Sequence, residues 1–314
     1  MAGAQYLGRD SRHADQPGAK NGRNPGCDRV SDRLLIGPGE LAELVKAGEC
    51  LVFDCRFDLQ HPGAGRNSWL AAHIPGAVYA NTDEHLAGPV TARSGRHPLP
   101  TTRSFAAFLA RSGWRKDLRV VAYDAHGGAY AARLWWLLKY FGLGNATLLD
   151  GGLNAWMKAG LPLESGATNT ERRPAPVLER RHHLVLKTQE VVEGLAGQSL
   201  RLVDARGARR FRGEVEPIDP VAGHVPGALN HPFEMNLEAD RRFKPAAALA
   251  SGFARVAARI EPERLVHMCG SGITACQNIF AMELAGIEGA RLYAGSWSEW
   301  IRNPSRPVAL GPDG

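Results

Sequence analysis

The hydrophobic positions of this 314-residue chain fall into short runs that alternate with longer, periodic stretches. Short apolar runs begin near residues 51, 120, 201 and 265, and each has the length of a buried strand. Segments 105–110, 133–139 and 276–285 instead place apolar residues at helical spacing. The alternation predicts an α/β fold with a mostly parallel sheet and helices on both of its faces.

The chain carries this pattern twice, with four pairs of matching landmarks in the same order. The strand Leu51-Val-Phe-Asp-Cys-Arg56 matches Arg201-Leu-Val-Asp-Ala-Arg206, and the loop His73-Ile-Pro-Gly-Ala77 matches His224-Val-Pro-Gly-Ala228. The paired landmarks start at 51 and 201, 73 and 224, 120 and 265, and 150 and 294, which are offsets of 150, 151, 145 and 144 residues. Near-constant spacing across four landmarks predicts two tandem copies of one domain.

We therefore expect a flexible tail at 1–33, a first domain at 34–163, a linker at 164–183 and a second domain at 184–314. The tail is polar and lacks the apolar segment of a secretory signal. The linker contains Pro174, Pro176 and many charged residues, which is typical of a segment that crosses the surface.

Composition narrows the possible environment and partners. The formal net charge is +6, but the basic residues are spread along the chain, so we expect no nucleic-acid partner and only a mild attraction for small anions. No apolar run approaches 18 residues, so we expect no membrane span. The chain has five cysteines, an odd number that argues against a disulfide framework and favours a reducing cytoplasm.

The segment Cys269-Gly-Ser-Gly-Ile-Thr-Ala275 carries the strongest chemical signal. It follows an apolar strand and precedes a helical pattern, so Cys269 should be the first residue of a tight loop. Gly270 and Gly272 let the backbone curl so that N–H groups point at the sulfur, and the following helix adds its positive N-terminal end. Both effects favour a thiolate, which is the nucleophilic form of cysteine. We therefore interpret Cys269 as a reactive residue rather than an inert core cysteine.

The first copy differs at this position. Asp124 stands where Cys269 stands in the second copy, and aspartate cannot perform thiol chemistry. The first copy is therefore expected to be inactive and to help form the cleft.

Together these motifs resemble the rhodanese family, and specifically its tandem-domain sulfurtransferases. The resemblance extends over nearly everything after the tail, and it includes the Gly-Ser-Trp-Ser-Glu-Trp segment that begins at Gly295. It implies that Cys269 takes a sulfane sulfur from a donor, becomes a persulfide and passes the sulfur on. The acceptor would be cyanide or a thiol such as thioredoxin or glutathione. The resemblance implies no cofactor and no metal.

The loop also bears on the donor. The loop resembles that of 3-mercaptopyruvate sulfurtransferases in the residues that follow Cys269, which are Gly270, Ser271, Gly272, Ile273 and Thr274. In the thiosulfate type of the family, two basic residues stand at the positions of Gly270 and Ser271. The chemistry agrees, because a dianionic thiosulfate gains from cations in the loop and a thiol donor gains from a hydroxyl that handles protons. A thiosulfate:cyanide sulfurtransferase is the alternative.

The resemblance also suggests residues that hold the donor. Arg206 and Arg210 are expected to bind it, with Arg210 on the carboxylate. A second arginine normally follows Glu-Pro in the family, but Ile218 stands at that position here, so Arg209 and Arg212 are the candidate substitutes.

The resemblance further suggests that His73 could approach the loop and form a relay with Ser271. No carboxylate precedes His73 within 62–69, and Asp58 is the nearest candidate for a third member. A structural hydrogen-bonding role for His73 is an equal alternative.

Two other classes of function remain open. A phosphatase of related fold would need an arginine six residues after the cysteine, where this chain has Ala275. A non-catalytic binding module is disfavoured by the intact cysteine loop. Cys276 could regulate by forming a disulfide with Cys269, but a helix-packing role is favoured. No metal site is expected, because cysteine and histidine lack zinc-binding spacings.

Overall fold

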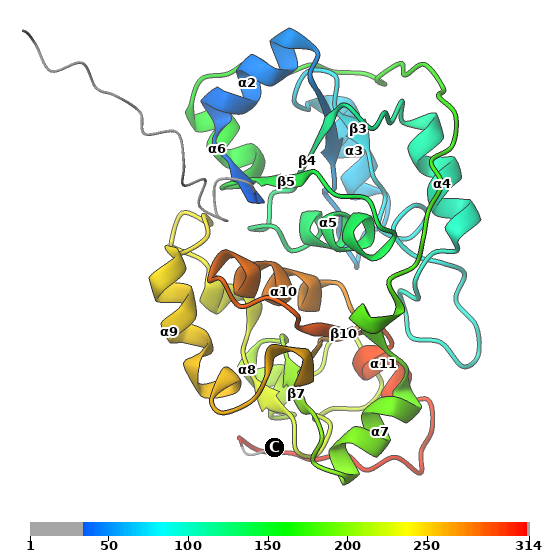
Figure 1. Cartoon of the computed structure of the whole chain (residues 1–314), viewed down its shortest axis with the longest axis vertical. Helices are drawn as coiled ribbons and strands as arrows, with labels where there is room; N and C mark the ends of the chain where they lie inside the picture. The colour runs from blue at the N-terminus through cyan, green and yellow to red at the C-terminus, as the bar shows by residue number, and fades with distance from the viewer. Residues whose placement is uncertain (1–33, 313–314) are drawn as a thin grey trace, which may run out of the picture.

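The computed structural model describes residues 34–312, which form two lobes stacked one above the other (Figure 1). The expected tail at 1–33 and Cys27 lie outside the described residues. Each lobe holds one five-stranded sheet, which confirms the α/β fold with two tandem domains. The boundaries drawn from the sequence, 34–163 and 184–314, stay predictions.

The first domain contains strands of two to five residues and helices of seven to ten residues. In chain order its elements are β1 (Leu35–Ile36), α2 (Pro38–Ala47), β2 (Cys50–Asp54), α3 (Ala64–Ala71), β3 (Val78–Tyr79), α4 (Thr102–Arg111), β4 (Arg119–Tyr123), α5 (Ala131–Tyr140), β5 (Ala146–Leu149) and α6 (Gly152–Lys158).

The second domain repeats this order and adds three short 3₁₀ turns. Its elements are η1 (His182–Leu184), β6 (Val185–Leu186), α7 (Thr188–Ala196), β7 (Arg201–Asp204), α8 (Ala208–Phe211), β8 (Leu229–Asn230), η2 (Phe233–Asn236), α9 (Ala246–Ala257), η3 (Pro262–Arg264), β9 (Leu265–Met268), α10 (Thr274–Leu284), β10 (Arg291–Tyr293) and α11 (Ser296–Trp300).

The two sheets have the same topology, with strand orders β1-β5-β4-β2-β3 and β6-β10-β9-β7-β8, and every pairing is parallel. All four residues of β9 are buried, as expected of a central strand covered by helices on both faces. The carboxyl ends of neighbouring parallel strands meet at one edge, which is where ligands bind in open α/β sheets. Cys269 follows β9 directly, so the topology places it at that edge.

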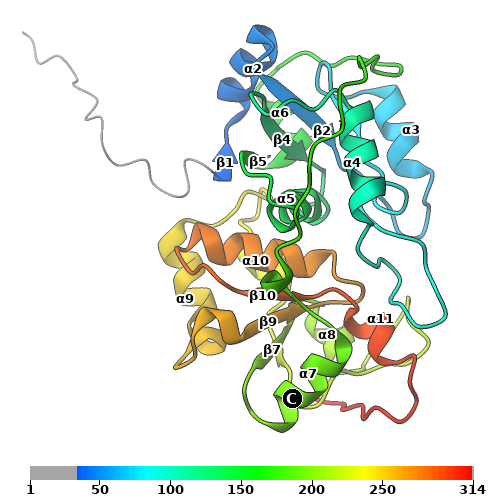
Figure 2. The ribbon, with the colours of Figure 1, turned by 45° about the vertical axis from the view of Figure 1, so that its right-hand side comes forward.

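Helices α5 and α10 face each other between the lobes (Figures 1 and 2). Trp135 of α5 meets Phe280 of α10 edge to face, with ring centroids 4.9 Å apart, and Lys139 forms an ion pair with Glu283. From Ala275 to Leu284 every residue of α10 is buried, because one side of the helix packs on its own sheet and another on the first domain. The hydrophobic core is therefore continuous across the two domains.

Arg133 of α5 makes the most buried polar contact of this interface. Its side chain is fully buried, and its Nε and Nη2 donate to the carbonyls of Leu86 (3.3 Å) and His97 (3.2 Å) in the first domain. Its Nη1 donates across the interface to the carbonyl of Gly272, at 3.1 Å, in the cysteine loop. One guanidinium thus ties the two domains together at three carbonyls, and those of Leu86 and His97 would otherwise be buried without a donor, while that of Gly272 also accepts from the Cys276 thiol.

A second connection comes from the long loop between β3 and α4. In both views this loop leaves the first domain and reaches α11 of the second (Figures 1 and 2). The backbone N–H of Arg96 donates to Ser298 Oγ at 2.9 Å, and that of Gly95 donates to Glu299 Oε2 at 3.3 Å. A Cβ on Gly95 would lie 2.5 Å from the carbonyl oxygen of Gly295, so only glycine permits this contact.

Within residues 34–312, no helix is both long and apolar enough to cross a membrane.

Replacing Arg133 with methionine should destabilise the folded protein, because the carbonyls of Leu86 and His97 would stay buried without a donor and that of Gly272 would keep only the weak thiol donor of Cys276. A buried unsatisfied group costs ~1–3 kcal/mol, so we expect the free energy of unfolding to fall by about 3 kcal/mol. The check is chemical denaturation followed by fluorescence. Arg103→Met, at an exposed position of α4, is the matched control. Equal stability of the two variants would contradict the role given to Arg133.

Candidate active site

Cys269 lies between the last residue of β9 and the first turn of α10, as expected from the sequence. Its Sγ is 3.1 Å from the backbone nitrogen of Gly272 and 3.5 Å from that of Ser271, and both N–H groups donate to it. The N-terminus of α10, an 11-residue helix, begins at Thr274. Hydrogen bonds of this kind stabilise negative charge on sulfur, on a thiolate or on a persulfide.

Local geometry explains the glycine at position 272. Gly272 has a φ of +78°, and a Cβ there would lie 2.6 Å from the carbonyl oxygen of Ala294. A side chain would therefore be excluded both by backbone strain and by the adjacent strand end. The loop must be this tight for the Gly272 N–H to reach the sulfur.

The start of α11 braces the other side of the cysteine loop. Ser296 Oγ accepts a hydrogen bond from the Cys269 N–H at 3.1 Å, and the N–H groups of Trp297 and Ser298 donate to the carbonyls of Cys269 and Gly270. Ser296 has a φ of +54°, an uncommon conformation for a residue with a side chain. The Gly-Ser-Trp-Ser-Glu-Trp segment thus holds the loop from behind.

A chain of three polar side chains runs from the loop into the first domain. The hydroxyl of Ser271 lies 2.7 Å from Nδ1 of His97, and Nε2 of His97 lies 3.0 Å from Asp83 Oδ1. Hydrogen bonding to Asp83 favours the tautomer with its proton on Nε2, so Nδ1 accepts from Ser271. Burial lowers the pKa of His97 below its ordinary value of 6.5, and the hydrogen bond with Asp83 opposes that shift. The imidazole is therefore neutral near pH 7 and can accept a proton.

The histidine expected in this relay is corrected from His73 to His97. The structure places His73 inside the first domain, with Nδ1 2.7 Å from the carbonyl of Trp69 and Nε2 3.2 Å from Thr168 Oγ1. One ring nitrogen is therefore used within the first domain and the other by the linker. Asp58, the carboxylate considered for the relay, instead accepts from the backbone of Gln60 and His61 at the surface. The carboxylate of the relay is Asp83.

Sequence reasoning missed His97 and Asp83 because they lie in an irregular loop with no strand or helix period. Their partner Ser271 is 174 residues from His97. A signal was present in Ser94-Gly-Arg-His-Pro-Leu-Pro100, where a histidine stands between an arginine and two prolines in a long loop, but no sequence period links that loop to Ser271.

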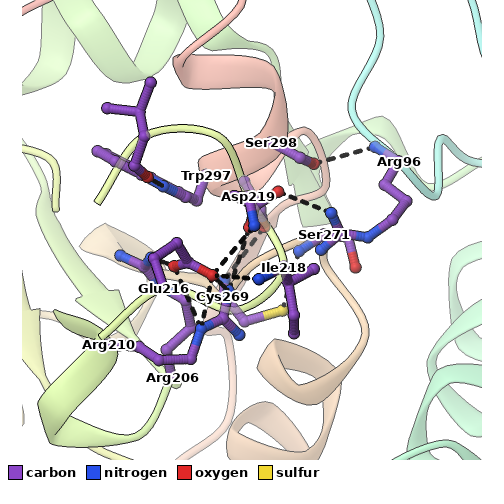
Figure 3. A network of polar contacts seen from close by, with 12 residues as sticks. Arg96, Arg206, Arg210, Glu216, Ile218, Asp219, Cys269, Ser271, Trp297 and Ser298 are labelled. Atoms are coloured by element: carbon purple, nitrogen blue, oxygen red, sulfur yellow. Dashed lines mark hydrogen bonds and ion pairs between the residues drawn. The ribbon is translucent and has the colours of Figure 1, made fainter. Parts of the chain in front are cut away.

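Arg206 and Arg210 both lie beside Cys269, but the protein already uses many of their donors (Figure 3). Arg206 is almost fully buried, donates twice to Asp204 Oδ2 and once to the carbonyl of Gly223, and stacks over Trp297 at 4.8 Å. The Arg206 guanidinium is therefore held in one position by its protein partners beside the cysteine loop. Its predicted role in binding the donor is untested.

Arg210 is more open, with 20% of its side chain exposed. It pairs with Glu216 at 2.7 Å and with Asp219 at 3.1 Å, and its Nη2 lies 3.7 Å from where a Cβ on Gly270 would be. It therefore faces the cysteine loop, as the sequence predicts, and its role in binding the donor is likewise untested.

The two arginines considered as substitutes for the cation missing at Ile218 lie elsewhere. Arg209 and Arg212 both pair with Glu214, which is 45% exposed at the surface. Neither belongs to the cavity over Cys269.

That cavity has a volume of about 300 Å³, which suits a small molecule rather than a macromolecular chain. Residues of both domains line it, including Phe57, Arg96 and His97 of the first and Arg210 and Cys269 of the second. Four larger cavities among residues 34–312, including one of about 540 Å³ beside Lys139, have no cysteine in their linings. Within residues 34–312, no cluster of histidine, cysteine, aspartate and glutamate could hold a metal ion.

The first domain uses the equivalent loop differently. The carboxylate of Asp124 accepts from the backbone N–H groups of His126, Gly128, Tyr130 and Ala131 at 2.7–3.0 Å. An aspartate thus fills the position that the sulfur occupies in the second domain, and its carboxylate is held by the backbone of its own loop.

The fold and this site define a two-domain protein in which Cys269 is held in a cradle of backbone N–H groups beside a hydrogen-bonded serine–histidine–aspartate chain. The family model of the rhodanese-like domain matches the chain twice, at residues 37–159 and 187–303. The chain belongs to the rhodanese family.

Individual relatives match this chain over nearly all of their own length. A Pseudomonas aeruginosa protein named "Probable 3-mercaptopyruvate sulfurtransferase" is 45% identical over 90% of this chain and 100% of its own. The thiosulfate sulfurtransferase of Bos taurus is 32% identical over 91% of this chain and 98% of its own. Among solved structures, the 3-mercaptopyruvate sulfurtransferase from Leishmania major superposes with a TM-score of 0.74 at 30% identity, covering 88% of this chain and 75% of that chain.

The other described cysteines should be much less reactive than Cys269. Burial raises the pKa of Cys50 to about 11, that of Cys276 to about 12 and that of Cys55 well above its ordinary range. In a Cys27→Ser background we expect iodoacetamide at neutral pH to alkylate Cys269 at least about tenfold faster than these three, because the thiolate is the reactive form. Peptide mass spectrometry over time measures the rates, and comparable labelling of Cys50 or Cys276 would contradict the assignment.

Proposed function

We propose that this protein transfers the sulfur of 3-mercaptopyruvate to a thiol or cyanide acceptor through a persulfide on Cys269. The observation that carries the proposal is the hydrogen-bonded chain from Ser271 through His97 to Asp83. Ser271, where this chain starts, is two residues after Cys269 in the same loop. A thiol donor has a proton to move during sulfur transfer, and this chain can move it.

The chemistry balances with the residues present. The Cys269 thiolate attacks the donor sulfur, an S–S bond forms, and the C–S bond breaks with its electron pair going to the enolate of pyruvate. The thiol proton passes through Ser271 and His97 to the enolate carbon, which gives pyruvate and an anionic persulfide. The N–H groups of Ser271 and Gly272 then stabilise the charge on the persulfide. An acceptor thiolate or cyanide attacks the outer sulfur and regenerates the Cys269 thiolate.

The composition of the loop favours this donor over thiosulfate. Gly270 and Ser271 bring no cation into the loop, so a dianionic donor would depend there on backbone N–H groups. Thiosulfate also carries no proton for the Ser271–His97 chain to move.

A thiosulfate sulfurtransferase is the second candidate, and one contact favours it. Arg96 places a guanidinium nitrogen 3.2 Å from where a Cβ on Gly270 would be, so a cation does stand over the loop. Thiosulfate, however, has no proton for the Ser271–His97 chain to move, which is why the first candidate is preferred.

The acceptor and the compartment follow from the same chemistry. A persulfide at the bottom of a cavity of about 300 Å³ is open to cyanide, to glutathione or to the reactive cysteine of a thioredoxin-like protein. The four cysteines within residues 34–312 are all free, which supports a reducing compartment such as the cytoplasm.

The test of the proposed function is a steady-state comparison of 3-mercaptopyruvate with thiosulfate, using cyanide as acceptor and thiocyanate formation as readout. We expect the higher kcat/KM for mercaptopyruvate. Cys269→Ser should abolish turnover of both donors, whereas Cys50→Ser should retain it. A higher kcat/KM for thiosulfate would overturn the donor assignment and leave the persulfide in place, and normal turnover by Cys269→Ser would overturn the mechanism.

The relay predicts a specific pH dependence. His97 must be neutral to accept a proton, so protonating it should lower kcat/KM for mercaptopyruvate, and because burial lowers its pKa the acid limb should lie below pH 6.5. Asp83→Asn removes the carboxylate that raises this pKa, so the limb should move to still lower pH. Pyruvate release across a pH series measures both profiles. An unchanged limb, or one that moves upward, would exclude His97 as the titrating group.

A further inference from the structure

Arg96 stands over the cysteine loop although it belongs to the other domain. It lies in the loop between β3 and α4, where its backbone N–H is held by Ser298 Oγ at 2.9 Å (Figure 3). Its Nη2 is 3.2 Å from the position that a Cβ on Gly270 would take, closer than the Nη2 of Arg210 at 3.7 Å. Two guanidinium groups, one from each domain, therefore converge on the same point of the loop.

Asp219 holds these two arginines side by side. Its Oδ1 accepts from Arg96 Nη1 at 2.7 Å, and its Oδ2 accepts from Arg210 Nη2 at 3.1 Å (Figure 3). The carboxylate is almost fully buried, with 3% of its side chain exposed, so it works as a fixed clamp. A carboxylate that bridges two guanidinium groups orients both of them, and both arginines line the cavity over Cys269.

Arg96 keeps a donor for a ligand. Within residues 34–312 its side chain donates through Nη1 alone, to Asp219, so Nη2, the nitrogen closest to Gly270, has no acceptor there, and the buried Nε has none either. Arg210 instead is engaged by both Glu216 and Asp219. A buried N–H without an acceptor is costly, so a ligand that supplies an acceptor would be favoured at Arg96.

Ile218 explains why this arginine would be needed. Ile218 also lines the cavity, with 37% of its surface exposed, but it offers no charge. The cavity wall is therefore apolar at Ile218 and offers no second cation from the second domain there. Arg96 supplies that second cation from the first domain.

We propose that Arg96 is a substrate-binding residue, which together with Arg210 holds the carboxylate of the sulfur donor. This assignment rests on the proposed function, because it names the groups that recognise the donor at the same site. The carboxylate would bind over Gly270, with the adjoining carbon chain and its sulfur directed at Cys269. A side chain at position 270 would block the carboxylate from this place, so glycine is needed there for donor binding as well as for the shape of the loop.

The position of Arg96 makes donor binding depend on both domains. The backbone of Gly95 and Arg96 is pinned to Glu299 and Ser298, and the next residue, His97, carries the relay. One loop of the inactive domain thus delivers both the charge that binds the donor and the imidazole that moves its proton.

The experiment measures binding and turnover separately. Calorimetry on Cys269→Ser protein gives the Kd of 3-mercaptopyruvate and of mercaptoacetone, the same thiol ketone without the carboxylate. We expect Arg96→Ala to weaken mercaptopyruvate binding at least about tenfold, the lower end of what a charge-assisted hydrogen bond contributes, and to leave mercaptoacetone binding within about twofold. Arg93→Ala, at an exposed position of the same loop, is the matched control and should change neither.

A rescue variant separates a binding role from a structural one. Adding Ile218→Arg to Arg96→Ala should restore part of the lost affinity for mercaptopyruvate, because it returns a cation to the same cavity. Equal weakening of both ligands by Arg96→Ala would mean that the arginine only ties the domains together, and no weakening of either would also overturn the proposal. If unmodified protein does not turn over mercaptopyruvate, the proposed function fails, while selective weakening of carboxylate binding would still support Arg96.

Discussion

The site depends on one constraint, which is that the two domains must be docked through α5 and α10. Arg133 lies at the centre of this contact and donates to the carbonyls of Leu86 and His97 on one side and of Gly272 on the other. Because Gly272 also supplies an N–H to the Cys269 sulfur, the same buried guanidinium holds the relay histidine and the sulfur cradle in register. The hydrogen bond between His97 and Ser271 is possible only in this arrangement.

The two copies of the domain contribute different residues to the site. The second copy keeps the cysteine loop, whereas in the first copy the carboxylate of Asp124 accepts from the backbone N–H groups of its own loop and of the start of α5. The first copy therefore has no thiol at this position. The contribution of the first copy instead comes from an irregular loop that carries Asp83, Arg96 and His97 onto the second.

Charge in the site is arranged in balanced pairs. Arg206 is neutralised by Asp204, and Arg210 by Glu216, while Asp219 joins Arg210 to Arg96. Such pairing keeps several arginines close together without strong mutual repulsion and fixes their direction. A small anion entering the cavity therefore meets oriented donors rather than a diffuse positive surface.

The sequence by itself determined the duplicated α/β fold and the position of Cys269 in a tight loop between a strand and a helix, because these depend on local periodicity and on spacing along the chain. The family resemblance also pointed to Arg210. The sequence could not identify His97, Asp83 or Arg96, and it left His73 with two equal roles, because the relay joins residues 174 positions apart through a loop without periodicity. Only the packing of α5 against α10 decides which loop of the first domain meets the sulfur, since that choice depends on side-chain contacts between domains and leaves no pattern in either half.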